Sequence, residues 1–326
     1  MERREFPGIS AAVLKVFACI TMIIDHMGAT ILKRAITDTG FDGSIFGIYA
    51  EWYKIYYVVR GIGRLSFPVF CFLAVEGFLH TRSLAGYAVN LFIFSLVSEI
   101  PFNLAFQDRF IELGRDFAST GDLAGTRQNV CPTILCAILV MYVLKRISQK
   151  EKWDRSYDAV TYLCAPLAGG FAVYLIYSSG LKEYLPLELN SSSFWYTAVL
   201  AAFFSLAALM ITGSRFSRDQ RIKAAVSFIV VFAGFVCLER LNTDYGGWGL
   251  LAMVVMYLFR EDRFLAFAAG CMVLTLLDTF EGFTFFSIIP VMLYNGRRGR
   301  QNKYFFYSVY PGHLLILALI CALMGL

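Results

Sequence analysis

His26 is the residue whose chemistry is most distinctive in this sequence, because a neutral imidazole can accept a proton near pH 7. It follows Asp25 inside an apolar run, where it is available as a general base. Arg60 and Arg64 are four residues apart in a second apolar run and therefore share one helix face. Charged groups in such runs are costly and usually mark a site or a watery cavity. We interpret His26 as the base of a functional site; the other interpretation is a histidine that only packs between helices.

The depth of these residues follows from helix geometry. With a rise of about 1.5 Å per residue, Lys15 lies near the inner face of the first run and His26 lies about 16 Å further out. The second run descends from outside, so its arginines reach a similar depth. The outer half is therefore predicted to hold a polar cavity that is open outward and is formed by Asp25, His26, Arg60, Arg64, Glu99, Asn129 and Asp244.

The partners of these groups can be predicted in part. Adjacent helical residues point about 100° apart, so Asp25 is not expected to orient the ring of His26 and is expected to pair with Arg60 or Arg64. Asp244 is the candidate for orienting His26.

Two further residues have simpler expected roles. Glu76 lies near the inner end of the second run, where it can pair with Lys15. His313 lies early in the last apolar run, in Tyr310-Pro311-Gly312-His313, and is either part of the site or a residue of the helix start.

The elements that position these residues are transmembrane helices. The 326 residues are 58% hydrophobic and 16% charged, whereas soluble domains are nearer about 45–50% apolar and 25% charged. A bilayer core needs about 20 apolar residues as a helix. Candidate spans are 9–32, 53–79, 85–106, 130–147, 157–177, 194–213, 223–241, 246–260, 264–278, 283–295 and 304–325. We predict one all-α domain, 1–326, a polytopic transmembrane bundle of about ten or eleven spans; 264–278 and 283–295 are short enough to be a re-entrant pair.

Positive residues alternate between the two sides of these spans. With the N-terminus in the cytoplasm, the inner segments hold Arg3, Arg4, Arg82, Lys145, Arg146, Lys150, Lys152, Arg155, Arg215, Arg218, Arg221, Lys223, Arg260, Arg263, Arg297, Arg298, Arg300 and Lys303. The outer segments hold only Lys33, Arg34, Lys54, Arg109, Arg115, Arg127 and Lys182. This bias predicts a cytoplasmic N-terminus in a plasma (inner) membrane. The net charge of +5 is explained by these loops, so no nucleic-acid partner is expected.

The cysteines and one long polar stretch give less information about function. The eight cysteines lie in apolar segments without metal-site spacing, so we expect small hydrophobes and no metal. The polar stretch 107–128 is predicted to face outside, as a flexible connection or as a lid over the site.

Several blocks, in order along nearly the whole chain, resemble the TraX family of membrane proteins, which is associated with N-terminal acetylation of conjugative pilin. They are Leu14-Lys15, residues 24–28 (IDHMG), 60–68 (RGIGRLSFP), 72–77 (FLAVEG), 98–103 (SEIPFN), 128–130 (QNV), 243–246 (TDYG) and 306–314 (FYSVYPGHL). Lys15 and His26 are also separated by ten residues. This spacing is similar to the Arg and His of many multi-pass acyltransferases, a group that is similar to the heparan-alpha-glucosaminide acetyltransferases. Lys replaces Arg here, which keeps the charge but loses the bidentate fork.

The resemblance implies an acyltransferase that takes acetyl-CoA from the cytoplasm. Lys15 would attract the anionic donor and His26 would act as general base or acyl carrier. Arg60, Arg64 or Asn129 would stabilise the oxyanion. Glu76, Glu99, Tyr245 and His313 are further candidates for contacting a substrate or cofactor. The acceptor stays open among a pilin-like peptide, a glycan, a lipid head group and a small amine, and membrane lipid is the surrounding partner.

Two other classes of function fit the same residues. Buried Asp, His, Glu and Arg also build the proton relays of transporters, although no paired interrupted helices mark two halves here. A non-enzymatic partner in pilus or envelope assembly would explain the membrane segments but not the clustering of His26, Arg60 and Arg64.

Overall fold

The structure is a computed structural model that describes residues 8–38, 46–106, 127–180, 199, 201–208, 215–300 and 302–325. These residues form helices joined by turns and loops, with two isolated backbone bridges. The elements are α1 (Ala11–Met27), η1 (Gly28–Leu32), α2 (Lys33–Asp38), α3 (Phe46–Gly63), α4 (Ser66–His80), α5 (Leu84–Phe106), α7 (Cys131–Gln149), η3 (Arg155–Tyr157), α8 (Asp158–Ser178), α10 (Arg218–Arg240), α11 (Gly246–Leu258), α12 (Arg263–Leu277), η5 (Thr279–Ser287), α13 (Ile288–Met292) and α14 (Lys303–Met324). The all-α class is therefore confirmed.

Within the described ranges, seven helical segments are long and apolar enough to cross a membrane. Three shorter apolar segments, Gly246–Leu258, Arg263–Leu277 and Thr279–Met292, correspond to the predicted spans 246–260, 264–278 and 283–295. The chain is thus a multi-pass membrane protein. Whether the shorter segments cross fully stays a prediction. The span predicted at 194–213 is described only at 199 and 201–208, which are helical, and its remainder lies outside the described residues.

The predicted span 53–79 consists of two helices in one continuous run. The first, α3, ends at Gly63, and α4 begins at Ser66, whose hydroxyl donates to the carbonyl of Gly63 at 2.8 Å. Pro68 explains this break, because proline has no N–H to donate four residues back and its ring clashes with that carbonyl. The turn places Arg64 at the kink.

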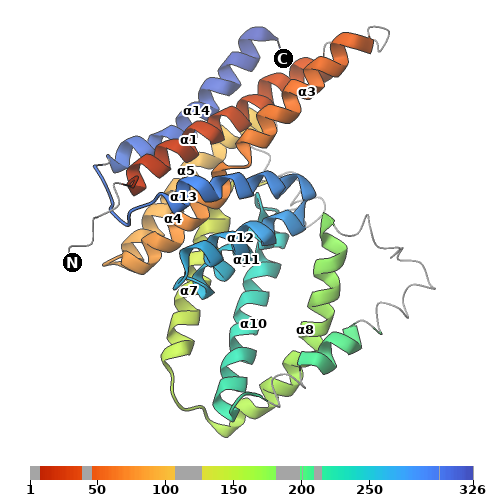
Figure 1. Cartoon of the computed structure of the whole chain (residues 1–326), viewed down its shortest axis with the longest axis vertical. Helices are drawn as coiled ribbons and strands as arrows, with labels where there is room; N and C mark the ends of the chain where they lie inside the picture. The colour runs from red at the N-terminus through yellow and green to blue at the C-terminus, as the bar shows by residue number, and fades with distance from the viewer. Residues whose placement is uncertain are drawn as a thin grey trace.

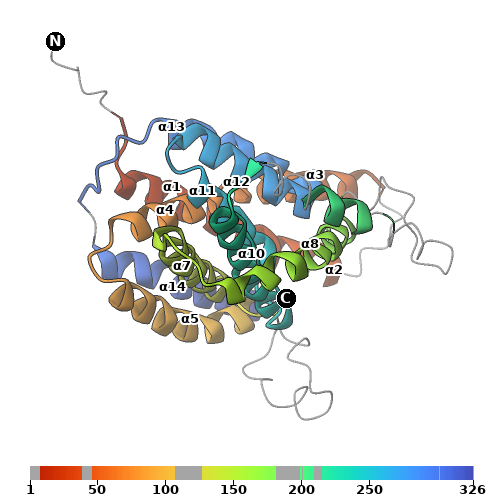
Figure 2. The same cartoon turned by 90° about the horizontal axis from the view of Figure 1, so that it is seen from below.

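The helices form two groups that cross each other. In Figure 1, α1, α3 and α14 run diagonally through the upper part, while α7, α8 and α10 run downward from it. Figure 2 shows α5 and α14 along one side and α12 and α13 along the other, with α1 and α4 between them. The main apolar core lies where α1, α4, α7, α11, α12 and α14 meet. Segments from the two ends of the sequence are therefore neighbours at the centre.

Backbone hydrogen bonds join the start of α1 to the loop that precedes α14. The N–H groups of Ala11 and Ala12 donate to the carbonyls of Arg297 and Arg298 at 2.9 and 3.1 Å, so the loop before α14 caps the start of α1.

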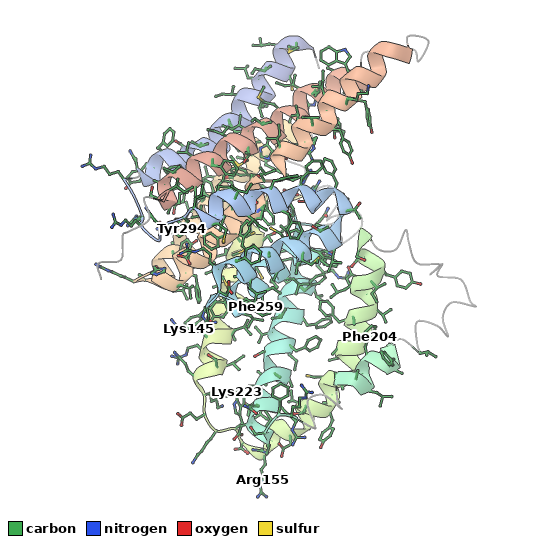
Figure 3. All side chains as sticks on the ribbon, viewed as in Figure 1. Lys145, Arg155, Phe204, Lys223, Phe259 and Tyr294 are labelled. Carbon is green, nitrogen blue, oxygen red and sulfur yellow. The ribbon has the colours of Figure 1, made fainter. Side chains whose placement is uncertain are left out.

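The helices α7 and α10 contact each other at the end of the molecule that lies away from α1. Figure 3 places Arg155 and Lys223 there, and the ammonium of Lys223 donates to the carbonyl of Ser148 at 3.1 Å. Two of the loops predicted as cytoplasmic thus pack together.

Candidate active site

His26 lies at the last turn of α1, directly before a change in helix type. The segment η1 that follows is a π-helix, and its Thr30 donates from its hydroxyl to the carbonyl of His26 at 2.6 Å. Gly28 lets α1 approach α3, because an added Cβ there would lie 2.8 Å from Cγ1 of Val59. Single π-helical turns often occur at functional sites. This local geometry fixes the backbone that carries the imidazole.

The imidazole of His26 is enclosed by α14 and α5. Its Nδ1 lies 2.7 Å from Nε2 of His313, which is only 8% exposed. Phe106 meets the ring edge to face with centroids 5.2 Å apart, and Tyr310 lies at 6.2 Å. Among the described residues, the polar side chain that contacts the His26 ring is therefore that of His313, and Phe106 and Tyr310 supply aromatic neighbours. His313 thus belongs to the site and not only to a helix start.

The predicted pairing of Asp25 with an arginine is confirmed for Arg60. Their charged atoms are 2.6 Å apart, and the same guanidinium nitrogen lies 3.4 Å from the backbone carbonyl of Asp25. A side chain at Gly63 would overlap the Asp25 carboxylate. The close approach of α3 to α1 at this glycine therefore permits the ion pair beside His26.

Arg64 belongs to a second ion pair that joins three elements. Its NH1 lies 2.7 Å from Oε1 of Glu281 and donates to the Tyr245 hydroxyl at 3.0 Å. Tyr245 has a left-handed backbone with φ 59° at the start of α11, and its ring stacks on Phe67 with centroids 3.7 Å apart. Burial, and next the Glu281 carboxylate, raise the pKa of Tyr245 well above its ordinary value, so the phenol keeps its proton. It donates to Glu281 at 3.3 Å.

Three buried polar atoms in these two pairs have no hydrogen-bond partner among the described residues. They are Oδ1 of Asp25, Nε of Arg64 and Oε2 of Glu281. Buried polar atoms are normally satisfied, so each such exception calls for a water or a ligand group. These two ion pairs, one of which contains the residue next to His26, thus retain donor and acceptor atoms that a substrate could use.

Glu99 and Asn129 contact each other near the end of α5 that is predicted to face outside. The Asn129 side-chain amide donates to Glu99 and to the carbonyl of Ser95, the latter at 3.0 Å, and Asn129 is fully buried. Its oxygen accepts from the N–H of Cys131 at 2.9 Å and so supports the start of α7. These contacts give Asn129 a structural role, with one oxygen of Glu99 buried and unpartnered.

The expectation that Asp244 orients His26 was wrong. Asp244 forms an ion pair with Arg127 at 2.6 Å, and its backbone N–H donates to the carbonyl of Gln128 at 3.0 Å. The nitrogen that contacts His26 comes from His313. Asp244 therefore joins the segment before α7 to the turn before α11, while most of the predicted loop 107–128 lies outside the described residues.

Lys15 and Glu76 lie away from His26. The Lys15 ammonium sits over the ring of Phe306 at 5.6 Å, and Glu76 lies 3.9 Å from His80. Glu76 also lines a cavity of about 150 Å³ between α4, α11 and α12 with Phe72, Val75, Met256, Arg260, Glu261, Arg263 and Ala266. That cavity contains none of the residues around His26. The structure therefore places Glu76 at this cavity and not against His26, and a role of Glu76 in binding a substrate or cofactor stays a prediction.

The sequence analysis missed Glu281, which is 4% exposed and neutralises Arg64. It was treated as a loop residue between two short spans, whereas η5 carries it into the interior. One feature of the sequence could have identified it, because Glu281 is the only charged residue in the stretch 279–292.

Among the residues that the structure describes, no group of three or more His, Cys, Asp or Glu side chains has the arrangement of a metal site.

Comparison with known proteins gives two matches. A family model described as TraX protein matches residues 10–204 and 179–321. A protein of Dichelobacter nodosus described as "Probable fimbrial assembly protein FimC, serogroup H1" is 24% identical over 335 aligned residues, which cover 96% of this chain and 95% of that protein. No solved structure matches the chain significantly.

Proposed function

Because the chain belongs to the TraX family, we propose that it is a membrane-embedded acyltransferase that moves an acetyl group from acetyl-CoA to an amine or hydroxyl acceptor. The observation that carries this proposal is that His26 follows Asp25 on α1 and that the guanidinium groups of Arg60 and Arg64, each paired with a carboxylate, act electrostatically on its imidazole. An imidazole supplies general-base catalysis, and fixed guanidinium groups stabilise developing negative charge.

The proposed reaction balances with these residues. His26 removes a proton from the acceptor, whose nitrogen or oxygen then forms a bond to the acetyl carbon. The carbon–sulfur bond breaks, and the proton passes from His26 to the leaving CoA thiolate. Nε of Arg64 is a buried donor without a partner in the described part of the chain, and we assign it to the oxyanion. Arg60 keeps Asp25 neutralised beside the reaction.

The donor is proposed to enter from the cytoplasm. Lys15 is eleven residues before His26 on α1, which corresponds to about 16 Å along the helix. A cation at the inner end would attract the phosphates of CoA, while the pantetheine arm reaches toward His26. This layout assumes an N-terminus in the cytoplasm and location in the plasma (inner) membrane, surrounded by lipid.

The acceptor is proposed to be the N-terminal amine of a pilin-like peptide. Support comes from the relative described as a fimbrial assembly protein, which aligns over nearly its whole length. A glycan, a lipid head group and a small amine are the acceptors to be compared with it, since a fold or family does not determine the substrate.

The test uses the full chain in nanodiscs with radiolabelled acetyl-CoA and a panel of these four acceptor types. We expect CoA release and acceptor labelling in the wild type, and a loss on the order of 100-fold in His26→Gln. His80→Gln is the matched control, because His80 is an exposed histidine whose ring contacts Glu76. Equal activity of His26→Gln and the wild type would exclude His26 as the base.

A non-enzymatic assembly role is the second candidate, and the printed name of the relative favours it. It predicts binding of a pilin-like peptide without any turnover of acetyl-CoA, and tolerance of alanine at His26, Arg60 and Arg64. A proton-coupled transporter instead predicts proton uptake into liposomes that depends on His26. The acetyl-CoA assay separates both from the acyltransferase.

A further inference from the structure

The bond between His26 and His313 connects residues that are 287 positions apart in the sequence. The two rings are nearly parallel, at 12°, with centroids 4.9 Å apart. Because the nitrogen atoms are only 2.7 Å apart, the rings must lie edge to edge in about one plane. That is the geometry of an N–H···N hydrogen bond and not of face-to-face stacking.

The second nitrogen of His313 determines where its proton lies. Nδ1 of His313 is 2.7 Å from the carbonyl oxygen of Val309, one turn earlier in α14. A carbonyl oxygen only accepts, so this nitrogen must be the donor. A neutral His313 therefore carries its proton on Nδ1 and has a lone pair on Nε2.

The tautomer of His26 follows from this arrangement. Since Nε2 of neutral His313 accepts, the proton between the rings must belong to Nδ1 of His26. Nε2 of His26 then has the lone pair. It forms no hydrogen bond to the residues that the structure describes, and is free to meet a substrate.

We propose that His313 is a positioning residue that selects this tautomer, so that Nε2 of His26 is the atom that takes the acceptor proton or the acetyl group. The inference rests on the proposed function for its chemical consequence but not for the tautomer itself. In the direct route, Nε2 gains the proton of the acceptor and later returns it to the thiolate. In the two-step route, Nε2 bonds to the acetyl carbon as the carbon–sulfur bond breaks, and Nδ1 releases its proton to Nε2 of His313. The acceptor then bonds to the acetyl carbon as the bond to Nε2 breaks. The proton of the acceptor passes to the CoA thiolate, and His313 returns its proton to Nδ1.

The sequence makes the tautomer measurable, because the chain contains only three histidines. Nitrogen NMR of ring-labelled histidine in nanodiscs at about pH 8 distinguishes protonated from unprotonated ring nitrogens. His26→Asn and His80→Asn assign the signals. We expect His26 and His313 both to be protonated at Nδ1 and unprotonated at Nε2. A wild-type His26 that is protonated at Nε2 would overturn the proposal whether or not the protein is active.

Two variants of His313 form a matched pair. His313→Gln places an amide oxygen near the position of Nε2 and can still accept from His26, whereas His313→Asn reaches only the position of Nδ1. We expect the Nδ1–H signal of His26 to persist in His313→Gln and to be lost in His313→Asn. Persistence in both would show that His313 does not select the tautomer.

The kinetic consequence separates this inference from the proposed function. If the protein transfers acetyl groups, His313→Asn should lower kcat on the order of 100-fold with little change in KM, and His313→Gln should retain more kcat than His313→Asn. Equal kcat in the two variants would overturn the positioning role. An inactive wild type with the expected tautomers would contradict the acetyl-transfer proposal and leave the tautomer assignment standing.

Discussion

The guanidinium of Arg64 lies 2.7 Å from the carboxylate of Glu281, and the side chains are only 15% and 5% exposed. The pair joins the kink between α3 and α4 to η5, and Tyr245 adds hydrogen bonds to both partners. Charges buried to this degree are compatible with folding because each neutralises the other. The site next to His26 is thus assembled from elements that are distant in sequence.

Removal of one partner of this pair should be strongly destabilising. We expect Glu281→Leu to lower the free energy of unfolding by about 3–5 kcal/mol, since it leaves the Arg64 charge buried alone. The double variant Arg64→Met, Glu281→Leu should recover much of that loss. Thermal unfolding of purified protein in one fixed detergent measures both.

The control for this prediction is the ion pair of Arg218 with Asp158, at 2.7 Å and with side chains 38% and 46% exposed. Asp158→Asn should change stability by no more than about 1 kcal/mol. A Glu281→Leu variant as stable as Asp158→Asn would contradict the structural role of the buried pair.

Gly63→Ala should disturb the site without changing any charged residue. Its added methyl group would overlap the Asp25 carboxylate, and such overpacking typically costs about 1–3 kcal/mol. We expect lower thermal stability and, in the acetyl-CoA assay, reduced turnover as Asp25 and Arg60 shift. Gly170→Ala in α8 is the matched control, because an added Cβ there meets no atom within 4 Å; the prediction fails if the two variants behave alike.

The stability of the protein should depend on both the size and the charge of the side chain at Asn129. Asn129→Ala removes the donors to Glu99 and Ser95 and the acceptor for the N–H of Cys131, and should cost about 1–3 kcal/mol for each group left unsatisfied. Asn129→Asp should be less stable still, because it places a second carboxylate against Glu99. Thermal unfolding that ranks wild type above Ala above Asp supports the geometry, and an Asp variant as stable as wild type would contradict it.

Lys15 should affect donor binding and not the chemical step. We expect Lys15→Gln to raise KM for acetyl-CoA with kcat nearly unchanged, which is the signature of lost uniform binding, and Lys15→Arg to stay near wild type. Lys223→Gln is the control, since Lys223 lies at the far end of α10 (Figure 3). A fall in kcat with unchanged KM would place Lys15 in the chemistry instead.

The orientation in the membrane can be tested with exposed positions. Arg127 and Lys152 are both exposed, and the positive-residue bias predicts Arg127 outside and Lys152 inside. A membrane-impermeant maleimide should label Arg127→Cys in intact cells but label Lys152→Cys only after permeabilisation. The wild-type chain, whose cysteines are mostly buried, gives the background, and the reverse labelling pattern would invert the predicted topology.

The sequence by itself determined the class of this protein and the importance of α1. Apolar runs of membrane-spanning length predict helices because backbone groups must bond internally in lipid. The rise per residue of a helix then gives the depth of His26, and its rotation per residue shows that the side chain of Asp25 points in a different direction from that of His26. The pairing of Asp25 with an arginine also followed, since few opposite charges lie at that depth.

Only the tertiary structure decided which helices meet at that depth. Local periodicity shows which residues lie on one face of a helix but not which distant face packs against it. Asp244 therefore seemed a suitable partner for His26, whereas the packing of α14 beside η1 supplies His313. Glu281 was assigned to a loop for the same reason, because its burial against Arg64 depends on how η5 folds back onto α4 and α12.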